Sequence, residues 1–150
     1  MVALHIKKLC VGAEDISDVI VWQTSKTARG TPITHVTRNY PKQADILLQN
    51  GSLYWVIKGY FQLRQSIAAL ERTPIMVPEK GIVQNFCTIV LDKQLWRVEQ
   101  RPHRPFQGWR YLQGKDAPRD IAPIDVSSID ALNTQMPVAM EQELIKIGVL

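Results

Sequence analysis

The sequence predicts an α+β fold, in which a small mixed or antiparallel sheet, barrel-like in shape, carries three or four short helices. Three observations lead to this class. Residues 51–59 (GSLYWVIKG) form the most apolar and aromatic run of the chain and have the length of an interior strand. Segments of helical and of strand periodicity alternate along the first half of the chain. Nine prolines in 150 residues indicate many turns rather than a helical bundle.

The composition predicts one ordinary folded domain. With 45% hydrophobic and 21% charged residues, the chain has the balance of a globular protein, and 150 residues are enough to bury a core. We therefore expect residues 1–150 to form a single domain. Cys10 and Cys87 lie in apolar runs without metal-ligand spacing and are expected to be buried thiols. The absence of a signal pattern and of an apolar run of about 18–20 residues predicts a cytoplasmic protein without a membrane partner.

The first half of the chain is expected to alternate strands and helices. Residues 4–11 alternate loosely between apolar and polar and predict a first strand. Residues 15–28 predict a helix, because apolar residues recur on one face and acidic residues favour its first turn. The β-branched run at residues 33–38 predicts a short strand. Residues 41–49 predict a helix that Pro41 opens.

The central and later segments are expected to be mostly strands. Both faces of a strand at residues 53–58 are largely apolar, which is typical of an interior strand covered on each side. Residues 60–71 fit a helix and a strand, and the adjacent strong strand favours the strand. Residues 86–91 predict a strand, and residues 96–100 a further short one. A loop or a single turn is expected at residues 116–123.

Charge is distributed unevenly along the chain. Residues 93–119 contain seven Lys and Arg against two Asp and Glu, a net charge of +5, whereas residues 120–150 contain one against five, a net charge of −4. The basic excess surrounds the aromatic side chains of residues 101–112 (RPHRPFQGWRYL), a segment that two prolines stiffen. This pattern favours an anionic partner. The acidic segment is expected to hold a helix start at 127–130 and a helix at 137–147.

The basic aromatic segment has the residue types of a surface for single-stranded nucleic acid. Arginines neutralise phosphates, and an aromatic ring stacks on an unpaired base. The leading hypothesis is a module that binds RNA or a nucleotide-like anion without a chemical step. Its predicted site consists of Arg38, Lys58, Arg64, Arg101, Arg104, Trp109 and Arg110. In the alternative interpretation, Phe106, Trp109 and Tyr111 plug the core while the arginines face water.

Two other functions are possible from the residues. His5, His35 and His103 lack metal-ligand spacing, and no phosphate loop or dinucleotide fingerprint is present, so neither a metal nor a cofactor is predicted. A small hydrolase or base-modifying enzyme would use His35 as a base with Thr37 or Ser52 as nucleophile, although no nucleophile elbow accompanies them. A protein-interaction module would use the acidic C-terminal segment to dock a partner or a second copy in a homo-oligomer.

Four motifs carry a resemblance to a known family: residues 35–38 (HVTR), 51–59 (GSLYWVIKG), 64–65 (RQ) and 104–112 (RPFQGWRYL). Together they resemble a small, mainly alphaproteobacterial family of unknown function, over nearly the whole chain. The resemblance implies no activity and transfers no catalytic residue. The Tyr/Trp-rich central strand also resembles PUA-like small barrels in architecture alone, and many of those bind RNA or modified bases.

Overall fold

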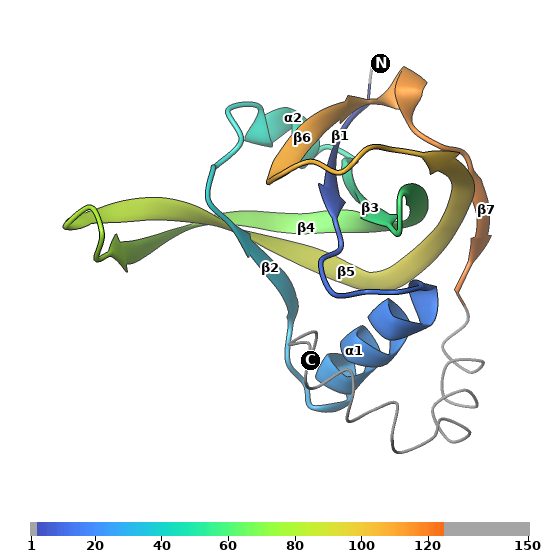
Figure 1. The fold of residues 1–150 in the computed structure, drawn as a ribbon, viewed down its shortest axis with the longest axis horizontal. Helices are drawn as coiled ribbons and strands as arrows, with labels where there is room; N and C mark the ends of the chain where they lie inside the picture. Colours follow the sequence, from blue (N-terminus) through green and yellow to red (C-terminus); the bar gives the residue numbers. More distant parts are fainter. Residues whose placement is uncertain (1–2, 125–150) are drawn as a thin grey trace.

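The computed structural model describes residues 3–124, which form a strongly curved seven-stranded sheet with two α-helices (Figure 1). The strand order is β2-β5-β4-β3-β1-β6, and β7 pairs with β5. Neighbouring strands are antiparallel except for the parallel pair β1 and β3. The elements in chain order are β1 (Leu4–Leu9), α1 (Ile16–Ala28), β2 (Ile33–Thr37), α2 (Ala44–Leu47), β3 (Ser52–Ile57), β4 (Tyr60–Val77), β5 (Ile82–Pro102), β6 (Trp109–Gln113), the 3₁₀ turn η1 (Gly114–Asp116) and β7 (Asp120–Pro123).

Strand β3 is the interior strand that the apolar run predicts, and all six of its residues are buried. Side chains alternate between the two faces of a strand. Leu53, Trp55 and Ile57 enter the larger core cluster, where Val19 and Ile20 of α1 also pack. The opposite face enters a second cluster, which contains Tyr54, Val56, Phe61, Val98 and Leu112. The run is therefore apolar without interruption because both faces of β3 are covered.

Two long strands, β4 and β5, make up much of the sheet. The ambiguous residues 60–71 lie within β4, so the expected strand is confirmed. The two strands expected at residues 86–91 and 96–100 are parts of the single strand β5. Figure 1 shows the far parts of β4 and β5 projecting from the rest of the protein as a two-stranded arm, which turns at residues 78–81. The arm carries exposed apolar side chains: Ile75, Met76, Ile82 and Val83.

Helix α1 confirms the helix expected at residues 15–28. Asp15 caps it, since the Asp15 Oδ1 atom accepts hydrogen bonds from the backbone N–H groups of Ser17 (3.0 Å) and Asp18 (3.3 Å). The Asp18 carboxylate accepts in return from the Asp15 N–H, which completes a capping box. This reciprocal pair satisfies amides that have no partner within the helix, and it fixes where the helix begins.

The helix expected at residues 41–49 is much shorter, because only Ala44–Leu47 are helical. No side chain caps its start at Gln43. Its end is set by Gly51, whose N–H donates to the Leu47 carbonyl at 2.7 Å. A Cβ atom at position 51 would lie 2.8 Å from the carbonyl oxygen of Leu4, so β1 passes too close for any side chain. The chain therefore leaves the helix early in order to enter β3 beside β1.

Three further expectations are corrected or remain open. A closed, PUA-like barrel is not confirmed, because the strand path is open between β2 and β6. The loop expected at residues 116–123 contains the strand β7. This strand forms by pairing with the distant β5, and a segment of four residues has no pattern of its own that predicts such pairing. The helices expected at 127–130 and 137–147 lie outside the described residues. None of the helices within residues 3–124 has the length and apolarity needed to cross a membrane.

A buried polar network ties α1 to the centre of the sheet. Gln65 of β4 has no exposed surface. Its Oε1 atom accepts from the Trp55 indole N–H (3.1 Å) and from the Gln23 amide (3.0 Å), and its Nε2 atom donates to Gln23 Oε1 and to the Asp92 carbonyl (2.9 Å). Buried polar groups are costly unless they are all paired. Gln65 therefore fixes how α1, β3 and β5 meet.

Gln65→Leu should lower the free energy of unfolding by about 3 kcal/mol, because it leaves the Trp55 indole N–H and the buried Gln23 amide without a partner. Urea denaturation followed by far-UV circular dichroism measures the change. Gln49→Leu, at an exposed position, is the matched control and should change stability by less than about 0.5 kcal/mol. Equal effects of the two substitutions would show that the Gln65 network adds nothing to stability.

Candidate functional site

The structure brings Arg38, Trp109 and Arg110 of the predicted site together in one pocket of about 750 Å³. The pocket lies where the connection from β2 to α2 meets β6 and the base of the arm (Figure 1). We call it the basic aromatic pocket. Among the described residues no Asp or Glu lines it. The basic residues that line it are Arg38, Lys42, Arg72 and Arg110, and its aromatic residues are Tyr40, Trp109 and Tyr111. The Arg110 guanidinium itself lies over Phe106, 5.6 Å from the centroid of that ring, at the border of the pocket.

The aromatic side chains of the basic aromatic pocket are held in place. The Trp109 indole N–H donates to the Asn39 carbonyl at 2.8 Å. The rings of Trp109 and Tyr111 meet edge to face, with their centroids 4.9 Å apart. The Gln43 backbone N–H donates to the Tyr111 hydroxyl oxygen at 3.1 Å. Trp109 is half-buried, so it packs against the core and also lines the pocket, which combines the two interpretations drawn from the sequence.

Arg72 and Lys42 are pocket residues that the sequence did not reveal. The Arg72 guanidinium lies 3.9 Å from the centroid of the Tyr40 ring, a cation–π contact that presets its position. Arg72 comes from β4, more than 30 residues from either Arg38 or Arg110 along the chain. Only the long antiparallel pairing of β4 with β5, and of β5 with β2, brings these positions together. No local signal in the sequence marks them.

Four residues of the predicted site lie elsewhere: Lys58, Arg64, Arg101 and Arg104. Lys58 sits in the two-residue turn between β3 and β4 and forms an ion pair with Glu14 at 2.5 Å. Arg101, near the end of β5, donates from Nε to Glu99 at 2.8 Å and from Nη1 to the Asp116 carbonyl at 3.1 Å. Arg104 is exposed in the loop before β6. The basic run at residues 101–110 is therefore divided between the pocket and other contacts.

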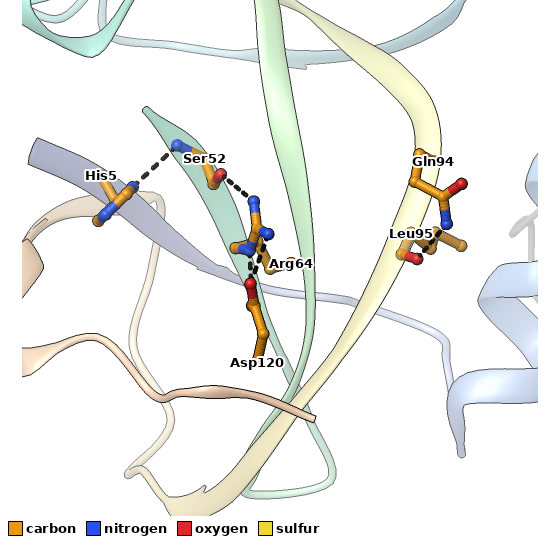
Figure 2. A network of polar contacts seen from close by, with 6 residues as sticks. All are labelled: His5, Ser52, Arg64, Gln94, Leu95 and Asp120. Atoms are coloured by element: carbon orange, nitrogen blue, oxygen red, sulfur yellow. Dashed lines mark hydrogen bonds and ion pairs between the residues drawn. The ribbon is translucent and has the colours of Figure 1, made fainter. Parts of the chain in front are cut away.

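Arg64 belongs to a separate polar network (Figure 2). Its Nε and Nη2 atoms donate to the two carboxylate oxygens of Asp120, at 2.8 and 2.7 Å, and Nη1 donates to the Ser52 hydroxyl oxygen at 3.1 Å. The Ser52 N–H in turn donates to His5 Nδ1 at 3.0 Å. The carboxylate of Asp120 raises the pKa of Arg64. Arg64 thus joins β4 to β7 rather than facing the basic aromatic pocket.

A second pocket, of about 460 Å³, adjoins this network and is lined by His5, Tyr54, Lys115 and Asp120 among others. We call it the His5 pocket. Burial lowers the pKa of His5, and the nearby Arg64 charge lowers it further. Burial raises the pKa of Tyr54. Sequence analysis missed this grouping, because the parallel pairing of β1 with β3, which places His5 beside Ser52, is not evident from either segment alone.

His35, the candidate catalytic base, stands apart from both pockets on β2. Its ring meets Trp55 edge to face at 5.5 Å, and its Nε2 atom is buried without a hydrogen-bond partner in the described part of the chain. Burial, together with the nearby charges of Lys8 and Lys26, lowers the pKa of His35 to about 4. Ser52, the candidate nucleophile, bonds to His5 and Arg64 rather than to His35.

Residues 3–124 hold no group of three or more His, Cys, Asp or Glu side chains that could bind a metal ion.

The fold and its pockets define an α+β protein with an open, strongly curved mixed sheet and a basic aromatic pocket at the base of a hairpin arm. The chain belongs to the family described as protein of unknown function DUF1489, whose model matches residues 6–150. The family resemblance carried by the four motifs is therefore confirmed. Neither the curated proteins nor the solved structures gave a match.

The lowered pKa of His35 predicts a loss of stability in acid. The unfolded chain binds a proton at His35 near pH 6.5 and the folded protein only near pH 4, so the contribution is complete above pH 6.5 and is lost as the pH falls from 6.5 toward 4. The contribution of His35 to the free energy of unfolding has an upper limit of about 3 kcal/mol, and the partial exposure of the ring reduces it. Urea denaturation gives the free energy of unfolding at pH 7.5 and at pH 4.5. The difference between these two values should be smaller for His35→Leu than for the unchanged protein. Identical differences would contradict the assignment.

Proposed function

We propose that this protein binds a nucleotide unit, free or within single-stranded RNA, in the basic aromatic pocket. The observation that carries the proposal is the gathering of four cations and three aromatic rings around one pocket that no carboxylate of the described residues lines. Arginine and lysine neutralise phosphate, and aromatic rings stack on bases. The pocket therefore offers partners for the phosphate and for the base of a nucleotide within one site.

Electrostatics supports an anionic ligand. The basic residues come from three segments: Arg38 and Lys42 from the connection between β2 and α2, Arg72 from β4 and Arg110 from β6. Like charges held close together repel one another. A bound phosphate relieves that repulsion and releases counterions, so the affinity should fall as salt rises. A volume of about 750 Å³ lies within the range of roughly 300–1,000 Å³ that small-molecule pockets show. A single nucleotide with its phosphate fits these dimensions.

The preset aromatic walls support the base-binding half of the proposal. The hydrogen bond to Asn39 and the contact with Tyr111 hold the Trp109 ring before any ligand arrives. The Arg72 guanidinium lies over Tyr40 and presents a flat, charged surface next to the pocket. Side chains that are ordered in the free protein lose little entropy on binding. The arrangement suits unpaired bases, which single-stranded RNA exposes and duplexes do not.

Replacing Arg38 and Arg110 together by Gln should weaken binding of a labelled random single-stranded RNA about tenfold at low salt. Each removed phosphate contact should also reduce the slope of log K against log salt by about 0.7. Fluorescence anisotropy at two salt concentrations measures both changes. The matched control replaces Arg97 and Arg104, two exposed arginines outside the pocket, by Gln, so that the net charge falls equally.

The two double variants separate a pocket from a general positive surface. If the control double variant loses as much RNA affinity as the pocket double variant does, binding depends on net charge alone and the proposal is wrong. If the unchanged protein binds neither the RNA nor adenosine monophosphate at low salt, the basic aromatic pocket has another role. Duplex DNA serves as the comparison ligand and should bind more weakly, because its bases are paired and stacked.

Trp109→Ala should weaken the binding of single-stranded RNA about tenfold or more, since a stacked base contributes about 1–3 kcal/mol to the binding free energy. The variant also removes the hydrogen bond to the Asn39 carbonyl, so its fold must be verified by circular dichroism before binding is compared. Trp22→Ala on α1, which lies outside the pocket, is the control and should bind RNA as the unchanged protein does. An unaffected affinity in folded Trp109→Ala would exclude stacking on this ring.

A second candidate function is a protein-interaction module, and the arm favours it. Ile75, Met76, Ile82 and Val83 are all exposed near its tip. Two-stranded hairpins that have no third strand or packing surface are only marginally stable in water. Exposed apolar patches on such an element are typical of a docking surface. This candidate concerns the tip of the arm and is compatible with an occupied pocket at its base.

A further inference from the structure

The His5 pocket holds two polar side chains that are deeply buried and incompletely paired. His5 is 8% and Tyr54 4% exposed, and both line the pocket. Within residues 3–124, neither the His5 Nε2 atom nor the Tyr54 hydroxyl forms a hydrogen bond, although His5 Nδ1 does. Neither atom is among the fully buried polar atoms without a partner, so each is accessible from the pocket and can bond to a molecule that enters it. None of these residues belongs to the basic aromatic pocket.

The protonation state of His5 follows from its bond to Ser52. The Ser52 backbone N–H can only donate, so His5 Nδ1 must accept and therefore carries no proton. A neutral imidazole then has its proton on Nε2. Burial and the Arg64 charge keep the pKa of His5 low, which holds the ring in this neutral form. Nε2–H is thus a fixed hydrogen-bond donor at neutral pH.

Tyr54 supplies a second neutral donor. Its ring packs edge to face against His5, with the centroids 5.1 Å apart. Burial raises the pKa of Tyr54, so the hydroxyl keeps its proton. The face of β3 that carries Tyr54 packs in an apolar cluster, and the Tyr54 side chain also lines the pocket beside Asp120. Two neutral donors from neighbouring strands therefore line the same small cavity.

Asp120 supplies an acceptor on the same cavity. Each of its carboxylate oxygens accepts one hydrogen bond from Arg64, at 2.8 and 2.7 Å. A carboxylate oxygen has capacity for a further bond, and the Asp120 side chain is 42% exposed. Figure 2 shows His5, Ser52, Arg64 and Asp120 as one chain of contacts across β1, β3, β4 and β7. The Arg64 charge balances that of Asp120, so the network as a whole favours a neutral ligand.

We propose that the His5 pocket binds a small neutral molecule with a lactam edge, a ring carbonyl next to a ring N–H. The carbonyl oxygen accepts from His5 Nε2–H and Tyr54 O–H, and the adjacent N–H donates to Asp120. Ala3, Ala117 and Pro118 supply the apolar remainder of the wall against which a flat ring packs. The inference goes beyond the proposed nucleotide site and is independent of it, since the two pockets share no residue.

The test uses 2-pyridone, a minimal lactam, and N-methyl-2-pyridone, in which a methyl group replaces the hydrogen of the N–H. Titration of the full ¹⁵N-labelled chain is followed by NMR at the Ser52 amide, which bonds directly to His5. We expect 2-pyridone to shift this resonance saturably and to bind about tenfold more tightly than its N-methyl analogue, because a hydrogen bond to a charged carboxylate is lost. No shift with 2-pyridone, or equal affinities for the two, would overturn the proposal.

Tyr54→Phe removes only the hydroxyl, which holds nothing else together in the described part of the chain, so the variant should fold normally. It should bind 2-pyridone about fivefold more weakly. Tyr60→Phe, at an exposed tyrosine outside the pocket, should bind as the unchanged protein does. Unchanged affinity in Tyr54→Phe would overturn the assignment. So would competition by inorganic phosphate, which would make the pocket an anion site formed by Lys115 and Arg64.

Discussion

The burial of β3 on both faces is the constraint on which the rest of the structure depends. A strand covered on each side must lie between two layers, and here α1 covers one face while the smaller cluster from β4, β5 and β6 covers the other. The sheet has to curve strongly to supply both layers from so short a chain. The two long strands β4 and β5 provide that curvature, with register shifts along their pairing. Strands β1, β2 and β7 each pair with one of these three strands, and β6 pairs with β1.

Both pockets follow from how β1 is placed beside β3. Parallel pairing sets His5 against Ser52 on one edge of β3, and antiparallel pairing with β6 sets Lys8 opposite Trp109 on the other edge of β1. The first contact defines the His5 pocket, and the second brings Trp109 and Arg110 to the connection between β2 and α2. Gly51 makes the approach possible, because a side chain there would collide with Leu4. The close packing of one strand therefore organises two separate polar sites.

Local pattern predicted the elements well, and long-range pairing limited the rest. The helix at residues 15–28 and the buried strand at 53–58 followed from periodicity and capping residues, which act within a few positions. The helix at 41–49 was overestimated, because the close contact of Gly51 with β1 is not a local property. The strand at residues 120–123 was missed, since its only support is pairing with β5. Barrel closure could not be decided from strand count, because it depends on whether the edge strands meet.

Of the predicted site residues, the structure brings Arg38, Trp109 and Arg110 to one pocket, and it adds residues to that pocket that the sequence did not indicate. Trp109 and Arg110 neighbour each other on β6, so composition alone indicated them. Arg72 completes the same pocket from the distant strand β4, and Lys42 from the connection that also carries Arg38. Conversely, Arg101 and Lys58 looked available as cations, but Lys58 pairs with Glu14, far away in the sequence, and Arg101 pairs with Glu99, two residues before it. A run of positive charge therefore becomes a binding surface only where folding leaves its cations without local carboxylates. Within the described residues that condition is met at the base of the arm, where four cations line one cavity.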